Sequence, residues 1–313
     1  MVKFSVVIPV HNKLPHLERS INSVLNQTFS DFELILVDDA STDGSSNKIK
    51  EFNDSRIRIY IRDTPGPGGY AARNLGIEKA EGEWVAFLDA DDEWHPNHLE
   101  KMNDLSLIFP DVFVMGCGWI TENKHGKEPS PFFKANAARE PFLIELSQFL
   151  QNGLSKQLPI CTIVTCVKRN SPELLNLFPA RSDAKRGGDL YAWLKLVCFH
   201  KQMAWSNHIG ATYHIDSVNM VTKKSSFSIV NLSKPKYNEL AVGLNNEEKV
   251  LLKKFFNFRI KNDLKASKIQ GSKMENVLKN IQFRGDLINA LVIILLWVGP
   301  VRLLSNLKNK IKR

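Results

Sequence analysis

The sequence has little cysteine, and this excludes two classes of protein. Its 313 residues contain four cysteines (Cys117, Cys161, Cys166 and Cys198), and none forms a CxxC pair. A disulfide-stapled domain and a CxxC metal site are therefore excluded, and we interpret the four thiols as reduced core residues of a cytoplasmic protein. Residues 4–10 form an apolar run of seven that ends in polar residues, so we expect a first strand there and not the core of a signal peptide.

Long hydrophobic runs and nucleotide-binding glycine signatures are also missing. Residues 287–301 carry no charge, but these 15 positions fall short of the roughly 20 that span a bilayer. The glycine-rich residues 64–69 are not followed by the Lys-Ser or Lys-Thr of a Walker A loop, and they do not form GxGxxG. As a phosphate loop this segment is a weak signal.

Acidic residues are scarce in one part of the chain only. Residues 249–313 hold 15 Lys and Arg against 3 Asp and Glu, a net charge of +12, so the overall +9 leaves −3 for residues 1–248. Charge that is confined to one tail, beside an apolar run, favours a lipid surface over nucleic acid as the partner. The fractions of charged (24%) and hydrophobic (43%) residues are those of a globular protein.

Strand-like and helix-like patterns alternate over the first 110 residues. Apolar runs predict strands, and apolar residues at helical spacing predict helices between them. The expected strands are 4–10, 32–38, 56–61 and 85–88, and the expected helices are 14–25, 46–52 and 70–80. This βαβαβαβ order predicts an α/β fold with a parallel, doubly wound sheet. Later in the chain we expect strands at 111–115 and 160–167, a helix at 188–199, a loop at 213–228 and lysine-rich helices at 247–260 and 273–283.

Three carboxylates follow the fourth predicted strand. Asp89, Asp91 and Asp92 lie where an open α/β sheet binds ligands, just beyond the carboxyl end of a strand. Carboxylates this close repel one another unless a cation or hydrogen-bond donors offset their charge. Mg²⁺ or Mn²⁺ suits oxygen ligands that also meet a phosphate. The alternative is that Asp91 or Asp92 caps the next helix.

Other polar residues are expected near the same edge. Asp39 ends the second predicted strand and can accept a hydrogen bond from a base N–H or a ribose hydroxyl, although an N-cap or Asx turn is the alternative. Arg73, in the helix after the glycine loop, can add charge-assisted hydrogen bonds to a phosphate. We interpret His95 and His98 as surface residues and not as a metal pair.

These signals occur together in a known family. Five segments, in order over about 90 residues, closely resemble family 2 glycosyltransferases of the GT-A fold, of the type that builds bacterial surface polysaccharides. They are residues 5–12 (SVVIPVHN), 23–29 (SVLNQTF), 33–44 (ELILVDDASTDG), 72–76 (ARNLG) and 82–92 (GEWVAFLDADD). The resemblance implies a GT-A, Rossmann-like fold with a mostly parallel sheet flanked by helices, followed here by a helical basic and apolar tail.

The resemblance also implies roles for single residues. Asp39 is expected to read the uracil of the donor. Asp89 and Asp91 are expected to hold the Mn²⁺ or Mg²⁺ that bridges the donor diphosphate, with Asp91 the closer ligand. The rest of the nucleotide-sugar pocket is expected to include Pro9, Val10, Asn12, Arg73 and Ala90.

The second half of the chain resembles the family less. Asp189, which follows Gly188 and opens an aromatic-rich helix, looks like the general base of the family, and a plain helix N-cap is the alternative. Residues 213–217 (YHIDS), which include His214, lie where relatives carry a mobile loop with a His or Arg near the pyrophosphate, but the match is loose.

Taken together, the sequence predicts a metal-dependent, inverting transfer from a nucleotide-diphosphate sugar, most simply a UDP-sugar, to a hydroxyl of a lipid-linked saccharide. We expect a catalytic domain at 1–220, with a nucleotide-binding half (1–110) and an acceptor-binding half (111–220). A helical basic extension (221–286) and a membrane-associating segment (287–313) follow. The protein is expected on the inner face of the cytoplasmic membrane, without a nucleic-acid partner, and a homodimer is left open.

Two other functions fit parts of the sequence. A sugar-nucleotide nucleotidyltransferase shares the sheet and its acidic edge, but carries a Gly- and Arg-rich loop where this chain has residues 10–15 (VHNKLP). A non-catalytic membrane- or nucleic-acid-binding protein would use the basic tail. For residues 287–313 the alternative to a helix at the membrane interface is packing on the protein itself or on a second subunit.

Overall fold

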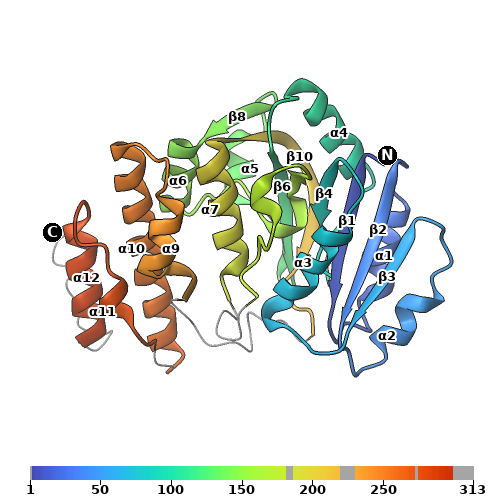
Figure 1. Cartoon of the computed structure of the whole chain (residues 1–313), viewed down its shortest axis with the longest axis horizontal. Coiled ribbons are helices and arrows are strands. Elements are labelled where there is room, and N and C mark those ends of the chain that lie inside the picture. The colour runs from blue at the N-terminus through green and yellow to red at the C-terminus, as the bar shows by residue number, and fades with distance from the viewer. Residues whose placement is uncertain (1, 181–185, 219–229, 272–273, 299–313) are drawn as a thin grey trace.

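The computed structural model describes residues 2–180, 186–218, 230–271 and 274–298. In the first part of the chain it confirms the predicted alternation of strands and helices (Figure 1). The elements are β1 (Phe4–Val10), α1 (Leu17–Leu25), β2 (Phe32–Asp39), α2 (Ser45–Lys48), η1 (Ile49–Glu51), β3 (Ile57–Arg62), η2 (Pro67–Gly69), α3 (Tyr70–Lys79) and β4 (Trp84–Phe87). β2 and β4 are buried along their whole length, because helices cover both faces of this part of the sheet.

Within the described residues, ten strands form one mixed sheet. The order is β3-β2-β1-β4-β9-β6-β10-β5, with β7 on β6 and β8 on β10. The first four strands are parallel: Val10 pairs with Asp38, and Val7 pairs with Phe87. The carboxyl ends of β1, β2 and β4 therefore meet at one edge, which brings their acidic loops together.

The second half of the sheet is built differently. It contains β5 (Glu93–Trp94), α4 (His98–Ile108), β6 (Val114–Asn123), β7 (Gly126–Pro129), α5 (Pro131–Asn136), β8 (Phe142–Glu145), α6 (Leu146–Leu154), η3 (Thr162–Val164), β9 (Cys166–Lys168), η4 (Pro172–Leu174), α7 (Gly188–His200) and β10 (Gln202–His214). β9 is antiparallel to both β4 and β6 and so joins the two halves.

Two expectations for this half are wrong. Of the strand expected at 160–167, only the last two residues belong to a strand, β9, and Thr162–Val164 form the 3-10 helix η3. In addition, β10 occupies thirteen residues in which we predicted no strand. The register of β10 against β6 shifts between Ser206 and Ile209 and again before Ala211. These irregularities break the apolar alternation by which a half-buried strand is recognised.

The C-terminal part is helical. It comprises η5 (Val230–Leu232), α9 (Lys234–Leu240), α10 (Asn246–Ile269), α11 (Val277–Asn280) and α12 (Leu287–Val298), at the end of the molecule away from β3 (Figure 1). A capping box starts α10: Glu248 N–H donates to Asn245 Oδ1 (2.9 Å), and Asn245 N–H donates to Glu248 Oε2 (2.8 Å). Gly153 of α6 admits the ring of Phe255, since a Cβ at Gly153 would lie 2.3 Å from that ring.

The core has one apolar cluster on each face of the sheet. One packs α1 and α4 against the sheet. The other runs without interruption from the sheet through α3, α6 and α7 to α10 and α12. The described part of the tail is therefore packed on the helices that flank the sheet, while the expected domain boundaries stay a prediction.

His98 is not a surface residue, so this expectation is also wrong. Its side chain is fully buried beneath Trp94, with ring centroids 4.6 Å apart, and its Nδ1 lies 3.4 Å from Nε2 of His208. The cause is the pairing of β5 with β10, which draws the first turn of α4 against the sheet. Burial lowers the pKa of His98 well below its usual range.

Candidate active site

The edge where β1, β2 and β4 end borders a cavity of about 950 Å³. It brings together four predicted carboxylates from three separate parts of the chain: Asp39, Asp89 with Asp91, and Asp189. Pro9, Val10, Arg73 and Ala90, which were also predicted, line it as well. Seven of the predicted nucleotide-sugar and metal residues, together with the predicted general base Asp189, therefore line one cavity.

Asn12 differs from the other candidates because it is not part of the cavity lining. It has a φ of 53°, and its side-chain carbonyl accepts a hydrogen bond from Thr42 N–H (2.8 Å). Its backbone N–H donates to Ser41 Oγ (3.0 Å). Asn12 therefore ties the loop after β1 to the loop after β2, beside the cavity.

Asp39 is almost fully buried, at 1% exposure, although it reaches the cavity. Arg62 forms an ion pair with its Oδ1, and Gly66 N–H donates to its Oδ2 (2.9 Å). These two partners fix the carboxylate. Because each carboxylate oxygen has two lone pairs, Asp39 can still accept a hydrogen bond from a base.

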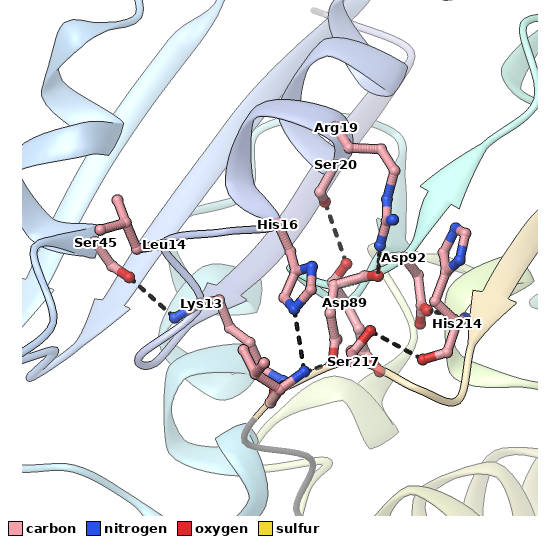
Figure 2. Close-up of polar contacts among 12 residues, drawn as sticks. Lys13, Leu14, His16, Arg19, Ser20, Ser45, Asp89, Asp92, His214 and Ser217 are labelled. Carbon is pink, nitrogen blue, oxygen red and sulfur yellow. Dashed lines mark hydrogen bonds and ion pairs between the residues drawn. The ribbon is translucent and has the colours of Figure 1, made fainter. Parts of the chain in front are cut away.

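Asp89 and Asp91 each pair with a basic side chain. Arg73 of α3 contacts Asp89, and Lys13 Nζ lies 2.5 Å from Asp91 Oδ2. The turn is also held through its backbone. Ser20 Oγ donates to the carbonyl of Asp89 (3.2 Å), as Figure 2 shows. Arg19 contacts the carbonyl of Asp91. The charge that crowded carboxylates require is thus supplied by Arg73 and Lys13.

Asp92 does not line the cavity and is completely buried. His214 N–H donates to its Oδ1 (2.7 Å), and its Oδ2 has no hydrogen-bond partner among the described residues. Burial, together with the charges of Asp89 and Asp91, raises the pKa of Asp92 well above its usual range. Asp92 does not cap α4, whose N-cap is Asn97, so the capping alternative for this acidic turn is wrong.

The donor set of Asp89 and Asp91 fits a hard divalent cation. Both carboxylates face the cavity, each uses one oxygen for its basic partner, and each has a second oxygen. Oxygen ligands of this kind match Mg²⁺ and Mn²⁺. Two other groups of metal-ligating side chains occur in the described residues, outside the cavity lining: His98 with Cys117 and His208, and Glu93 with Glu122 and His214.

The glycine loop before α3 approaches the cavity through its backbone. Gly68 and Gly69 have φ values of 61° and 72°, which side chains rarely adopt. Arg73 Nη1 donates to the carbonyl of Gly68 (2.9 Å), and the guanidinium also lies over the ring of Phe178. Arg73 is thereby held rigidly between the glycine loop and Asp89.

Asp189 lies in the first turn of α7 and lines the cavity. The N-cap of α7 is Gly187, and no side chain caps this end, so the alternative that Asp189 is the N-cap is wrong. Gly188 N–H donates to Tyr70 OH (2.9 Å), and a Cβ at Gly188 would lie 2.7 Å from the Tyr70 ring. Glycine is therefore needed here for α7 to approach α3. Burial, and then the charge of Asp189, raises the pKa of Tyr70.

Several residues of the site carried no sequence signal. Lys13 contacts both Asp91 and the carbonyl of Val218 (2.9 Å), and His16 Nε2 accepts a hydrogen bond from Val218 N–H (3.1 Å), as Figure 2 shows for the His16 contact. The loop after β1 thus holds the segment after β10. His214, the loose family match, lies between Glu93 (3.2 Å) and Glu122 (3.5 Å) and does not line the cavity.

The sequence matches a known family over half of its length. The model of the family described as glycosyl transferase family 2 matches residues 5–163. An uncharacterized glycosyltransferase of Rickettsia bellii is 46% identical over 197 residues, which are 62% of this chain and 26% of that protein. The chain thus spans about a quarter of the length of this relative.

A second relative is matched over most of its length. It is the UDP-Glc:alpha-D-GlcNAc-diphosphoundecaprenol beta-1,3-glucosyltransferase WfgD of Escherichia coli, 29% identical over 238 residues, 75% of this chain and 81% of that protein. Among solved structures, S. aureus TarS 1-349 in complex with UDP-GlcNAc is similar with a TM-score of 0.76 and 18% identity, covering 94% of this chain and 89% of that one. This likeness confirms the predicted fold class.

Proposed function

This chain belongs to glycosyl transferase family 2, and we propose that it transfers a sugar from a UDP-sugar to a hydroxyl of a lipid-linked saccharide, with inversion at the anomeric carbon. One observation carries this proposal: a single cavity is lined by Asp39, by the Asp89–Asp91 pair and by Asp189. The substrates named for WfgD, and the nucleotide sugar bound to TarS, support the choice of donor and acceptor class.

The proposed reaction is a direct displacement. The acceptor oxygen forms a bond to the anomeric carbon while the bond from that carbon to the diphosphate oxygen breaks, and the nucleoside diphosphate leaves. Asp189 accepts the proton of the acceptor hydroxyl. Arg73 and Lys13 lie where they can balance negative charge on the leaving group.

The cofactor in this proposal is Mn²⁺ or Mg²⁺, held by Asp91 and Asp89. When bound, such an ion stabilises negative charge on phosphate oxygens as a Lewis acid. The fit of two cavity-facing carboxylates to a hard cation supports this assignment.

The test is transfer by the purified protein. The protein is incubated with Mn²⁺, with each of a panel of nucleotide sugars, and with N-acetylglucosamine linked to a lipid diphosphate as the acceptor. The release of nucleotide is measured. We expect release of UDP from one UDP-sugar, and a product whose new linkage has the opposite configuration to the donor. Absence of turnover with every nucleotide sugar would reject the proposal.

Replacement of Asp39 tests the assignment of the base pocket. Asp39→Ala should weaken UDP binding by roughly tenfold or more, because a buried base N–H loses its acceptor at a cost of about 1–3 kcal/mol. Calorimetry measures the affinity. Asp54→Ala is the matched control, since Asp54 also forms an ion pair with an arginine, Arg56, but does not line the cavity. Equal UDP affinity in Asp39→Ala and the parent contradicts the assignment.

We also propose that α12 holds the protein on the inner face of the cytoplasmic membrane. Within residues 2–298 as described, none of the helices is long and apolar enough to cross a membrane. Ala290, Ile293 and Leu296 of α12 are buried against the protein. Its other face leaves large apolar side chains exposed: Leu287, Ile288, Leu291, Leu295 and Val298. Residues 299–313, the rest of the predicted segment, lie outside the described residues.

The membrane proposal predicts the effect of a triple substitution. Ile288→Gln, Leu295→Gln and Val298→Gln together should reduce co-sedimentation with anionic vesicles at least about tenfold, since each apolar side chain contributes up to about 1.5–3 kcal/mol when it leaves water. The control is Leu107→Gln with Ile108→Gln, an exposed apolar pair on α4. If the parent stays off vesicles and forms a dimer that the triple variant loses, the face is a subunit interface.

A further inference from the structure

The side of the cavity formed by α6, α7 and α10 is rich in basic side chains. Lys156 follows α6, Arg186 precedes α7, and Arg259 and Lys265 belong to α10. In the described lining, Asp189 is the one carboxylate that comes from these three elements or their flanking loops. The other lining carboxylates follow β2 and β4, where Arg62, Arg73 and Lys13 pair with them.

One face of α10 forms this wall. Its lining residues recur at spacings of three and four, as one face of a helix requires. They are Phe258, Arg259, Asn262, Lys265, Ala266 and Ile269. Basic, polar and apolar side chains therefore alternate along a strip that ends at Ile269, the last residue of the helix.

Arg259 is the member of this wall whose pairing within the protein is visibly incomplete. Arg259 Nη2 lies 3.9 Å from Asp263 Oδ1, a long ion pair, and its Nε is buried without a hydrogen-bond partner among the described residues. Burial raises the pKa of Asp263, and the positive charges of Arg259 and Arg186 oppose this rise. The carboxylate of Asp263 therefore lies near two guanidinium groups. Lys156 has a φ of 62°, a conformation that glycine would adopt with less strain.

We propose that Lys156, Arg259 and Lys265, which we call the α10 cation wall, bind the diphosphate of the lipid-linked acceptor. This inference rests on the proposed function and adds where the acceptor is held. Arginine and lysine at a concave surface are the usual partners of phosphate oxygens. A cavity of about 950 Å³ lies at the upper end of the range for ligand pockets, roughly 300–1,000 Å³, so it can hold an acceptor head group beside the donor.

The apolar end of the strip leads from the cavity to an exposed apolar surface on which the lipid chain can lie. Ile269 lines the cavity and is 76% exposed. α12 runs parallel to α10, because Lys261 Nζ contacts Asn289 Oδ1 (2.5 Å) and Lys268 Nζ contacts the carbonyl of Trp297 (3.2 Å). The exposed apolar face of α12 therefore ends beside Ile269, and a lipid chain that leaves the diphosphate at Lys265 meets apolar surface.

The test measures binding of farnesyl diphosphate by calorimetry with UDP held at saturation, so that the nucleotide fills the donor site. Lys265→Gln and Arg259→Gln should each weaken this binding about tenfold, the loss expected for one charge-assisted hydrogen bond. Lys254→Gln is the matched control, because Lys254 belongs to the same helix and does not line the cavity. Thermal unfolding of each variant establishes that it is folded.

Two further probes separate the possible sources of affinity. Inorganic diphosphate tests the head group alone, and farnesol tests the chain alone, and we expect both to bind more weakly than farnesyl diphosphate. The inference is overturned if the parent does not bind farnesyl diphosphate, if both cavity variants bind it as the parent does, or if either single probe binds as tightly. Failure of the proposed function shows itself separately, as a lack of turnover with every nucleotide sugar.

Discussion

Asp91→Ala should reduce metal-dependent sugar transfer at least about 10²-fold, because it removes a carboxylate assigned to the ion that balances charge on the leaving diphosphate. The substitution also removes the carboxylate that pairs with Lys13 at 2.5 Å. Two measurements are needed: release of UDP at saturating donor, and binding of Mn²⁺ in the presence of UDP. We expect both to be lost together.

The neighbouring Asp92 provides a matched control for Asp91. Asp92 is completely buried outside the cavity lining, and burial raises its pKa, so the neutral asparagine, which has the same shape, is a mild substitution there. Asp92→Asn retains the oxygen that accepts from His214 N–H, and it should leave transfer close to that of the parent. Full activity of Asp91→Ala, or of the parent in EDTA, removes the metal from the mechanism.

The sequence predicted the parallel half of the fold because its elements are locally consistent. β1, β2 and β4 are short apolar runs that each end in polar residues, and the helices between them repeat at helical spacing. Parallel strands with helical crossovers must place their carboxyl ends at one edge. The convergence of Asp39 and Asp89 on one cavity was therefore predictable from the order of strands and helices along the chain.

The second half was less predictable because its pairing is not local. β10 contains register shifts, and it is completed by partners far away in sequence: Met115 in β6 pairs with Ala204, and Trp94 in β5 pairs with Ala211. No short window of sequence carries that information. A lysine-rich helix was predicted at 247–260, where α10 begins, but that one face of this helix lines the cavity follows only from its packing against α6.

The same distinction holds for the site itself. Acidic residues at strand ends are visible as a pattern, whereas their partners are 23 and 78 positions away, as for Arg62 with Asp39 and Lys13 with Asp91. Tyr70 looked like an ordinary first residue of a helix, and only the close approach of Gly188 reveals that it positions the start of α7. Lone basic and aromatic residues give no signal until the fold brings their partners to them.

Asp189→Asn should leave UDP binding near that of the parent and depress transfer by about 10²–10⁴-fold, the usual contribution of general-base catalysis. Asparagine keeps the shape of the side chain but cannot accept the proton of the acceptor hydroxyl. Asp189 sits in the first turn of α7, where a carboxylate also stabilises the helix modestly, by roughly 0.3–1 kcal/mol. That loss is too small to unfold the protein, so a large fall in transfer reports on chemistry.

Glu173→Gln is the control for Asp189→Asn. Glu173 does not line the cavity, and it forms an ion pair (3.0 Å) with Lys195 of α7, the helix that carries Asp189. The substitution removes a carboxylate from the surroundings of α7 and should leave transfer unchanged. Rates with saturating donor, UDP affinities and thermal unfolding are measured for both variants. A general base predicts a low kcat with a normal UDP affinity in Asp189→Asn alone, and a melting temperature lowered by no more than the modest loss of helix stabilisation. Equal transfer in both variants would mean that Asp189 stabilises the start of α7 and takes no part in proton transfer.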